Sequence, residues 1–516
     1  MAALMIQGCG SDVGKSLLVA GLCRLFANRG LTVRPFKPQN MSNNAAVTAS
    51  GGEIGRSTAL QALACRTPPT VDMNPVLLKP QSDIGAQLIV RGRRVGVMQA
   101  SAHGRDKREL LQIAVESYRR LQNEAQLVIV EGAGSPAETN LRANDIANMG
   151  FAHAADLSVV LVGDIDRGHV IASLIGAHAV LDEADRARIR GFIINKFRGD
   201  AGLFDDGLRT IEGRTGWPRL GVVPWLHQAF ALPAEDAMQL DQPGARNESS
   251  RSQRIRIVVP RLPHIANFDD FDPLRLEPRV ELIFVQPGQP LPLDAALIIL
   301  PGSKATIADL EFFRAQGWDI DLQAHIRHGG RVLGICAGYQ MLGAVVRDPQ
   351  RIEGHQESTR GLGLLDIETT MTADKQLRAI TGHDITTGAR ISGYEMHLGV
   401  STGPATTRPM IRFDNGATDG AVSADARISG CHVHGLFNDS AFRTAFLAVL
   451  GARSSGDDYS QRVEASLDEI AATLERALDI GGLSDIAKLR AVLKGPAAHP
   501  SAPPKPSSYS QFKNRE

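Results

Sequence analysis

Two glycine-bounded turns constrain this sequence most, because each follows a short apolar run and precedes a helical pattern. The first reads Gly-Cys-Gly-Ser-Asp-Val-Gly-Lys-Ser at residues 8–16, and the second reads Gly-Ile-Cys-Ala-Gly at residues 334–338. In α/β folds such a turn joins a strand to a helix at the carboxyl edge of a parallel sheet. One turn in each half of the chain therefore predicts an α/β protein with two tandem α/β domains.

The first half alternates compact apolar runs with helical patterns. The pattern at residues 16–28 places Leu18, Leu22 and Leu25 on one face, and a second helix is expected at residues 107–123. Alternation of this kind predicts a parallel sheet with helices on both faces. The expected strands are residues 4–6, 32–36, 127–130, 157–162, 191–194 and 220–223.

The second half repeats this alternation after a change in composition. Residues 241–254 are polar, rich in turn residues and without periodicity, which predicts a linker. The pattern then predicts strands at 255–259, 280–285, 295–300 and 331–335, with helices at 437–450 and 467–478 closing the second domain. We therefore divide the chain into a first domain at 1–240, a linker at 241–254, a second domain at 255–452, a helical segment at 453–495 and a disordered Pro/Ser-rich tail at 496–516.

Charge and cysteine usage exclude several classes of protein. Lys plus Arg equals Asp plus Glu at 56 each, so no overall field favours nucleic acid or a membrane. The five cysteines are scattered and form no Cys-x-x-Cys pair, which argues against a disulfide framework or a zinc site. No apolar run approaches the ~18 residues of a membrane helix, and the apolar start is too short for a signal peptide. We expect a cytoplasmic protein.

The turn at residues 8–16 has the chemistry of a phosphate-binding loop. A glycine turn, a helix N-terminus and a lysine together bind polyphosphate, so Gly8, Gly14 and Lys15 are expected to hold ATP. The Ser16 hydroxyl is expected to ligate Mg²⁺. Gly8 lies one residue too early for the standard P-loop, and this longer spacing resembles the dethiobiotin synthetase branch of P-loop proteins. A plain glycine turn with a surface lysine is the alternative.

Two further strand ends support a nucleotide site. Glu131 ends the apolar run at 127–130, which places its carboxylate at the sheet edge where a second Mg²⁺ ligand belongs. Asn195 follows the run at 191–194 and resembles the adenine-reading asparagine of the dethiobiotin synthetase group. The alternatives are a solvent-facing acid and an ordinary turn asparagine.

The turn at residues 334–338 presents the thiol of Cys336 in the cysteine counterpart of a nucleophile elbow. A helix N-terminus lowers a thiol pKa, and the N–H of Ala337 can stabilise an oxyanion. The pattern Gly-x-Cys-x-Gly-x-Gln resembles class I glutamine amidotransferases, in which a loop after an upstream strand donates the other oxyanion N–H. Here that loop points to Gly302 or Ser303, and we take Gly302. A small buried hydrophobe is the alternative interpretation of Cys336.

The base for this thiol is expected to be a histidine from the run Cys-His-Val-His-Gly-Leu-Phe at residues 431–437. Most class I amidotransferases have His-x-Glu here, and the Glu orients the imidazole. Neither His432 nor His434 has that Glu. The cobyrinate branch of the class instead has His-Gly-Leu-Phe, a match that makes His434 the base and His432 a variable neighbour. The pattern therefore predicts a Cys–His dyad.

The remaining motifs carry a resemblance to one family. They are Lys-Pro-Gln-Asn-Met-Ser-Asn-Asn at 37–44, Asp-Met-Asn-Pro-Val-Leu-Leu-Lys-Pro at 72–80, the run at 262–274, and Ser-Gly-Tyr-Glu-Met-His-Leu-Gly at 392–399. In this order, over about residues 4–450, the sequence resembles the cobyric acid synthases, the glutamine-hydrolysing enzymes of cobalamin biosynthesis. The resemblance implies an N-terminal P-loop NTPase-like domain that forms amides with ATP and a C-terminal class I glutamine amidotransferase-like domain.

The reaction that this resemblance implies is amidation of the b, d, e and g carboxylates of adenosylcobyrinic acid a,c-diamide. ATP, with Mg²⁺, would form acyl phosphates, and ammonia released from glutamine at Cys336 would displace the phosphate. Free ammonia is mostly protonated at neutral pH, so we expect it to travel inside the protein. Two alternatives are the sister enzyme that amidates the a and c carboxylates of cobyrinic acid, and a P-loop regulatory ATPase with an inactive amidotransferase module. None implies a nucleic acid or membrane partner.

Overall fold

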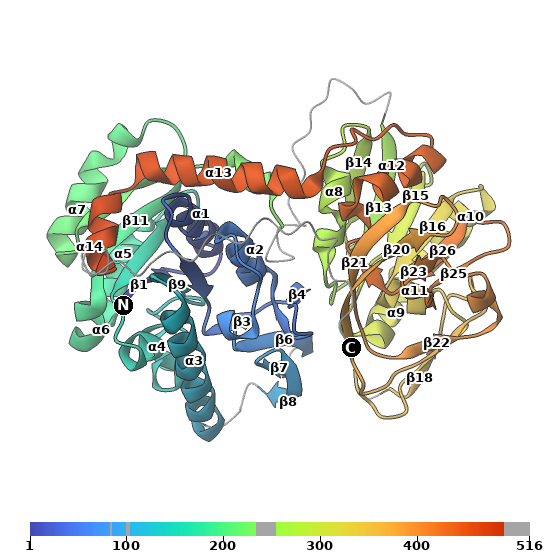
Figure 1. The fold of residues 1–516 in the computed structure, drawn as a ribbon, viewed down its shortest axis with the longest axis horizontal. Helices are drawn as coiled ribbons and strands as arrows, with labels where there is room; N and C mark the ends of the chain where they lie inside the picture. The colour runs from blue at the N-terminus through green and yellow to red at the C-terminus, as the bar shows by residue number, and fades with distance from the viewer. Residues whose placement is uncertain (83–84, 100–103, 234–253, 355, 490–516) are drawn as a thin grey trace.

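The computed structural model describes residues 1–82, 85–99, 104–233, 254–354 and 356–489, which form two lobes, with a long helix that lies along the first lobe and reaches the second (Figure 1). The predicted linker at 241–254 lies outside the described residues except for Arg254, and the predicted tail at 496–516 lies wholly outside them. Among the described helices, none is long and apolar enough to cross a membrane.

A parallel sheet of six strands forms the centre of the first lobe, in the order β12-β11-β10-β1-β9-β2. Every apolar run that predicted a strand in the first half forms one of these. The central strands are buried along nearly their whole length, as expected where helices cover both faces. Their bounds are β1 Ala2–Gly8, β2 Val33–Phe36, β9 Leu127–Glu131, β10 Val159–Asp164, β11 Ile189–Phe197 and β12 Arg219–Pro224.

Helices cover this sheet on two sides, each with its own apolar core. One core joins α1 to β1 and β9, and the other joins α3, α4, α5 and α7 to the opposite face. The helices of this lobe are α1 Lys15–Asn28, α2 Arg56–Ala64, α3 Gly104–Glu124, α4 Met149–Ala154, α5 Val170–Val180, α6 Glu183–Arg188 and α7 Asp205–Thr215, with 3-10 turns η1 Val71–Met73, η2 Thr139–Asn144, η3 Ala201–Phe204 and η4 His227–Ala231.

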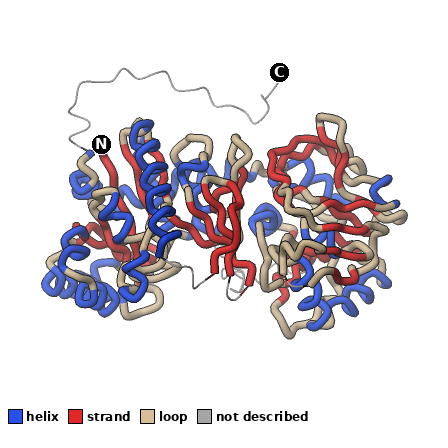
Figure 2. Tube along the Cα trace, turned by 90° about the horizontal axis from the view of Figure 1, so that it is seen from below, coloured by secondary structure: helices blue, strands red, loops and turns tan. Residues whose placement is uncertain are grey.

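Two small sheets that the sequence did not predict lie on the side of the first lobe that faces the second (Figures 1 and 2). One has the order β3-β6-β7-β8 and the other pairs β4 with β5. Strands β3, β4 and β5 have only three residues each, and the longer strands β6, β7 and β8 mix apolar residues with Gly, Pro, charged or amide residues, so no compact apolar run marks them in the sequence. Their bounds are β3 Gln39–Met41, β4 Ala45–Val47, β5 Glu53–Gly55, β6 Val76–Ser82, β7 Gly85–Val90 and β8 Arg93–Gln99.

The second lobe has its own six-stranded sheet, in the order β14-β13-β15-β16-β26-β25, parallel except for the last pair. An antiparallel sheet, β24-β23-β20-β21-β27, and a smaller one, β18-β17-β19-β22, pack beside it. The bounds are β13 Ile255–Pro260, β14 Val280–Val285, β15 Leu297–Leu300, β16 Arg331–Ile335, β17 Val345–Arg347, β18 Ser358–Arg360, β19 Glu368–Thr370, β20 Gln376–Asp384, β21 Arg390–His397, β22 Val400–Thr402, β23 Ile411–Phe413, β24 Thr418–Asp419, β25 Ala421–Val422, β26 Ile428–Cys431 and β27 Val433–His434.

Short helices surround these sheets and bury aromatic side chains against them. Phe313 and Trp318, on consecutive helices, pack edge to face in the core. The helical elements are η7 Phe268–Phe271, α8 Asp272–Arg275, α9 Thr306–Ala315, α10 Trp318–Arg327, α11 Ala337–Met341, η8 Pro404–Thr407, η9 Leu436–Asn438 and α12 Ser440–Val449.

The helix expected at 467–478 does not close the second domain, so that prediction is wrong. It belongs to α13 (Tyr459–Ala477), which returns to the first lobe and packs along α1 (Figure 1). A Cβ at Gly21 of α1 would lie 2.5 Å from Leu474 Cδ1, so the two helices are in close contact. Buried Arg24 pairs with Glu464 across them. The last helix, α14 (Ile480–Ile486), also joins the first lobe's core.

Candidate active sites

The loop between β1 and α1 is tightly closed. A Cβ at Gly8 would lie 2.4 Å from Val13 Cγ2, and Gly14 caps α1 in a left-handed conformation with φ of 88°. Both positions therefore require glycine. Lys15 is 7% exposed, and its Nζ donates to the carbonyls of Gly10 (2.8 Å) and Gly134 (3.1 Å). The loop and its lysine thus surround one small space at the helix N-terminus.

The two expected Mg²⁺ ligands are in contact. Ser16 Oγ donates to Glu131 Oε1 at 2.6 Å, and Glu131 is fully buried at the end of β9. Two residues without a predicted role complete its surroundings: Lys37 Nζ lies 2.9 Å from Oε1, and Gln61 Nε2 donates to Oε2. A hydroxyl and a carboxylate suit Mg²⁺, which usually keeps water and phosphate oxygens as its other ligands. No larger cluster of metal-ligating side chains occurs among the described residues.

Asn195 lies at the end of β11, directly beside the phosphate loop. Its Nδ2 donates to the carbonyl of Val13 at 2.8 Å, and a Cβ at Gly14 would lie 2.4 Å from the same nitrogen. The side chain is 3% exposed. It therefore braces the loop, and its expected contact with adenine remains a prediction.

Cys336 stands between β16 and α11 in a strained conformation. Its φ is 55° and its ψ is −111°, which costs a residue with a side chain roughly 1–3 kcal/mol. Cys336 N donates to the carbonyl of Cys431 at 2.8 Å, which holds the turn against β26. A Cβ at Gly338 would lie 2.0 Å from the carbonyl oxygen of Leu300, so the elbow packs directly on β15. This is the geometry expected of a nucleophile elbow.

His434 is oriented by a carboxylate that sequence reasoning missed. Its Nδ1 lies 2.7 Å from Asp270 Oδ2, and the other oxygen of Asp270 accepts from Gly435 N at 2.7 Å. Asp270 comes from η7, within the run at 262–274 that had no assigned role. The predicted dyad therefore extends to a Cys–His–Asp arrangement. No spacing links Asp270 to His434 in sequence, so only the fold could reveal this pair.

The charges in this arrangement favour a thiolate beside an imidazolium. Burial alone would lower the pKa of His434, but the charge of Asp270, aided by Cys336, raises that pKa to about 10. Burial alone would raise the pKa of Cys336, yet the charge and hydrogen bond of His434 hold it below its usual value, with smaller contributions from His432 and Lys304. The thiol is thus set for nucleophilic attack near neutral pH.

His432 has different partners from His434. Its Nδ1 lies 2.8 Å from Asp419 Oδ1, and its ring stacks on His397 with the centroids 4.0 Å apart. Burial opposes protonation of His432, but Asp419 raises its pKa. Residues 431–434 do not form one continuous strand, because β26 ends at Cys431 in one sheet and β27 begins at Val433 in another. Alternation therefore does not relate the two histidines.

One expected oxyanion donor lies beside the imidazole of His434, and the other directly follows the thiol in the chain. A Cβ at Gly302 would lie 3.0 Å from His434 Cε1, so Gly302 faces the imidazole directly. The neighbouring Ser303 directs its hydroxyl to Asp309 Oδ2 at 2.6 Å, away from the imidazole. Ala337 is the first residue of α11, directly after the thiol. The choice of the Gly302 N–H over that of Ser303 remains a prediction.

A second group of buried polar residues lies beside the elbow and was not predicted. Thr306 N donates to Glu353 Oε2 at 2.7 Å, and Gln340 Nε2 donates to the carbonyl of Leu398 at 2.9 Å. Burial raises the pKa of Glu353 to about 8. Glu353 also lines a small cavity of about 200 Å³ with Ala305 and others.

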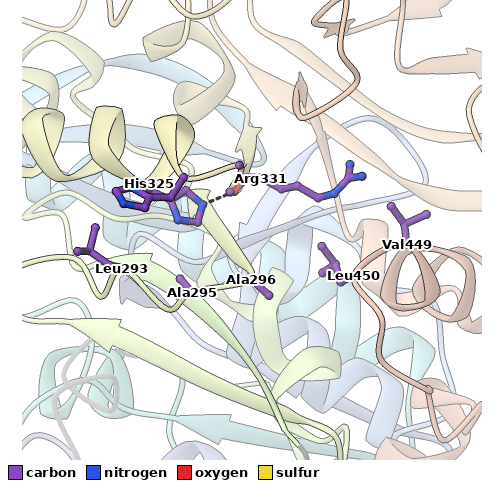
Figure 3. Close-up of a pocket in the computed structure, with 10 residues that line it drawn as sticks. Leu293, Ala295, Ala296, His325, Arg331, Val449 and Leu450 are labelled. Carbon is purple, nitrogen blue, oxygen red and sulfur yellow. Dashed lines mark hydrogen bonds between the residues drawn. The ribbon is translucent and has the colours of Figure 1, made fainter.

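A larger cavity, of about 270 Å³, lies at the other end of the same sheet (Figure 3). It is bounded by Ala295 and Arg331 at the amino ends of β15 and β16, and by Val449 of α12. His325 borders it and contacts the carbonyl of Arg331 at 3.0 Å. Cys336 follows the carboxyl end of β16, so this cavity is not the glutamine site.

Comparisons with known proteins match each lobe separately. Residues 4–239 match the family described as the CobQ/CobB/MinD/ParA nucleotide binding domain. Residues 256–442 match the family described as the CobB/CobQ-like glutamine amidotransferase domain. Together these matches span both sheets and agree with the two α/β units predicted from the sequence.

Close relatives match the chain along most of its length. A protein from Caulobacter sp. (strain K31) named cobyric acid synthase is 66% identical over 487 residues, which is 94% of this chain and 100% of that protein. Cobyric acid synthases from Rhizobium johnstonii and Rhodobacter capsulatus are 60% and 57% identical, covering 92% and 95% of this chain and 97% and 100% of their own lengths.

Two solved structures each match less than half of this chain. PurLQS from Thermotoga maritima has 16% identity and a TM-score of 0.29, covering 42% of this chain and 98% of that chain. The signal recognition particle 54 kDa protein from Aeropyrum pernix K1, in complex with GDP, has 16% identity and a TM-score of 0.26, covering 43% and 41%. At these scores the likeness supports no inference about function.

Proposed function

The chain belongs to the cobyric acid synthase family of glutamine-dependent amide-forming ligases, and from this premise we propose that it amidates the b, d, e and g carboxylates of adenosylcobyrinic acid a,c-diamide. The observation that carries the proposal is a prepared thiol, Cys336 beside His434 and Asp270, on the same chain as a P-loop. The shared name of the relatives argues against both the sister diamide synthase and a regulatory ATPase.

Ammonia release would follow from the charges at the elbow. The Cys336 thiolate attacks the amide carbon of glutamine, and the N–H groups of Gly302 and Ala337 stabilise the oxyanion that forms. The His434 imidazolium gives its proton to the amide nitrogen, the C–N bond breaks, and the nitrogen leaves as ammonia. The glutamyl group stays on Cys336 as a thioester. His434, now neutral, takes a proton from water as water attacks the thioester, which frees glutamate and the thiolate.

Activation of the substrate carboxylate would take place at the loop of the first lobe. The carboxylate oxygen attacks the γ-phosphorus of ATP, which breaks the bond to ADP and forms an acyl phosphate. Lys15, with the N–H groups of the loop, binds the phosphates. Ser16 and Glu131 would hold Mg²⁺, which neutralises phosphate charge. Ammonia then attacks the acyl carbon, and inorganic phosphate leaves with the formation of the amide.

The contact between the lobes supports internal transfer of the ammonia. The Cys336 thiol lies 3.7 Å from the carbonyl oxygen of Met396, and the sulfur of Met396 lies 3.8 Å from Lys79 Nζ of the first lobe. Met396 also packs with Ala45 and Leu77 in an apolar cluster shared by the two lobes. The thiol is thus separated from the first lobe by one buried residue, and this closeness supports a transfer of ammonia that is shielded from water.

One assay tests the whole proposal. The protein is incubated with glutamine, ATP and Mg²⁺ and with either adenosylcobyrinic acid a,c-diamide or cobyrinic acid, and the products are identified by mass. We expect up to four added amides on the diamide, each accompanied by hydrolysis of one ATP. Amidation of cobyrinic acid alone would favour the sister enzyme, and ATP hydrolysis without amidation would favour the regulatory ATPase.

A further inference from the structure

One helix of the first lobe touches both candidate sites. Near its carboxyl end, Gln61 of α2 donates to the carbonyl of Ser16 at 3.2 Å and to Glu131. At its first residue, Arg56 NH2 donates to Tyr394 Oη of the second lobe at 2.6 Å and lies 2.9 Å from Asp269 Oδ2. The helix is nine residues long, and Arg56 and Gln61 lie less than about two helical turns apart along it.

Each partner of Arg56 in the second lobe is next to a residue of the glutaminase site. Tyr394 contacts His434, and Asp269 is adjacent in the chain to Asp270, the residue that orients His434. The ring of Tyr394 stacks on the imidazole of His434, with the centroids 5.4 Å apart and the planes at 21°. Asp269 directly precedes Asp270, which accepts the hydrogen bond of His434. Arg56 is therefore linked to the imidazole through one residue, Tyr394, and also through the adjacent pair Asp269 and Asp270.

The segment that carries Asp270 is also fastened to the first lobe by other hydrogen bonds. Asn267 Nδ2 donates to the carbonyl of Ala45 at 3.2 Å and to Tyr394 Oη at 2.7 Å. Phe268 N donates to Asn44 Oδ1 at 3.1 Å. The first lobe thus contacts η7 and the residue before it at several points. Among these contacts, that of Arg56 with Asp269 is the ion pair.

That charge matters because Asp269 and Asp270 are adjacent and both buried. Burial raises the pKa of Asp269, and so does the charge of Asp270, while Arg56 acts in the opposite direction. Without the guanidinium, Asp269 would protonate or move towards water, because an unpaired buried carboxylate is costly. Either change would disturb the backbone that holds Asp270 against His434.

We propose that Arg56 is a positioning residue of the glutaminase site, supplied by the ATP-dependent lobe. The inference rests on the roles proposed for Cys336 and His434. It implies that the thiol and its base are fully aligned only when the lobes are docked. Because the same helix contacts Ser16 and Glu131, binding of ATP and Mg²⁺ there would alter the alignment of His434 through α2.

The test compares Arg56→Met and Arg56→Lys with the wild type in a glutaminase assay, with and without saturating ATP and Mg²⁺. We expect Arg56→Met to lower kcat about 10- to 100-fold with little change in KM for glutamine, because misplacement of a catalytic group affects the chemical step. Arg56→Lys is expected to recover part of the loss, since it restores the charge beside Asp269. The wild type should respond to nucleotide, and Arg56→Met should not.

Two controls separate the possible failures. Arg29→Met removes another arginine of the same lobe, one that forms an exposed pair with Glu475, and should behave as the wild type. Cys336→Ser should be inactive as a glutaminase; activity in this variant would overturn the proposed function itself. If Cys336→Ser is inactive while Arg56→Met keeps the kcat of the wild type, or the same response to nucleotide, only the role of Arg56 is overturned.

Discussion

His434 and Asp270 are 164 positions apart in the chain, yet Nδ1 of the histidine lies 2.7 Å from Oδ2 of the aspartate. Both side chains are almost completely buried. In most class I amidotransferases a glutamate two residues after the histidine has this orienting role. Here Leu436 occupies that position, and a distant turn supplies the carboxylate. The same chemistry is therefore obtained from a different part of the fold.

Asp270→Asn should lower glutaminase kcat/KM by about 10²–10⁴-fold. The charge of Asp270 is what raises the pKa of His434 against burial, so its loss lowers that pKa, and the weaker imidazolium lets the pKa of Cys336 rise. The active ion pair, the Cys336 thiolate with the His434 imidazolium, predominates at pH values above the pKa of Cys336 and below the pKa of His434. The acidic limb of the pH–rate profile should therefore move to higher pH and the basic limb to lower pH. An unchanged pH–rate profile would contradict the conclusion that the charge of Asp270 raises the pKa of His434.

Cys336→Ser should abolish synthesis from glutamine but spare synthesis from high concentrations of ammonium. Only the source of ammonia is lost, because the thiol has no part in forming the acyl phosphate. The measurement is amide formation on the corrinoid with each nitrogen donor at a pH where free ammonia is present. Failure of ammonium to rescue the variant would show that the two sites are not separable in this way.

Lys15→Ala should remove synthesis from both nitrogen donors. The lysine lies within the loop that would position the phosphates, so carboxylate activation is lost whichever donor supplies ammonia. The glutaminase activity measured without nucleotide should remain, because Lys15 Nζ donates to carbonyls of the first lobe, those of Gly10 and Gly134. Ammonium-dependent synthesis close to that of the wild type would exclude this loop as the activating site.

Glu131→Gln should raise the concentration of Mg²⁺ needed for half-maximal ammonium-dependent synthesis. The carboxylate contacts Ser16, and an amide is a much weaker ligand for a hard cation. Titration of Mg²⁺ at saturating ATP checks this, with Glu138→Gln as a control on the nearby loop. Equal Mg²⁺ requirements in wild type and variant would argue against Glu131 as a ligand.

His434→Ala should cost far more glutaminase activity than His432→Ala. His434 contacts Asp270 and is the main group that lowers the pKa of Cys336, while His432 contributes less to that pKa and pairs with Asp419. A general base contributes about 10²–10⁴-fold, so the difference should be plain in steady-state rates. A larger loss in His432→Ala would reverse the two assignments.

All strands of the first large sheet and the strands β13 to β16 of the second were predictable, because a buried parallel strand is a compact apolar run between turn residues. The remaining strands of the second sheet, β25 and β26, were not predicted. The strained turn at Cys336 was also predictable, since glycines at 334 and 338 allow the close packing that the elbow needs. By contrast, Asp270 could not be found from spacing, because its contact with His434 exists only after η7 and β27 meet. The change from one sheet to another between Cys431 and Val433 could not be predicted for a similar reason, because it has no signature in the amino-acid composition.

The helix at 467–478 shows another limit of pattern reasoning. An amphipathic pattern predicts a helix and the face that it buries, but it does not identify the surface that covers this face. Leu467, Ile470 and Leu474 of α13 pack on α1 instead of on the sheet that precedes them in the chain. Identifying that partner requires the three-dimensional arrangement of both lobes.

The return of α13 and α14 has a consequence for the order in which the protein can be completed on the ribosome. Synthesis proceeds from the N-terminus, so the first lobe emerges early, but part of its apolar core is encoded by the last described helices. Until these helices are made, the α1 surface that they cover stays exposed to solvent. The apolar core of the first lobe can therefore be completed only after the entire ammonia-producing lobe has been synthesised. A folded ATP-dependent lobe that lacks its nitrogen source is thus an unfavourable product.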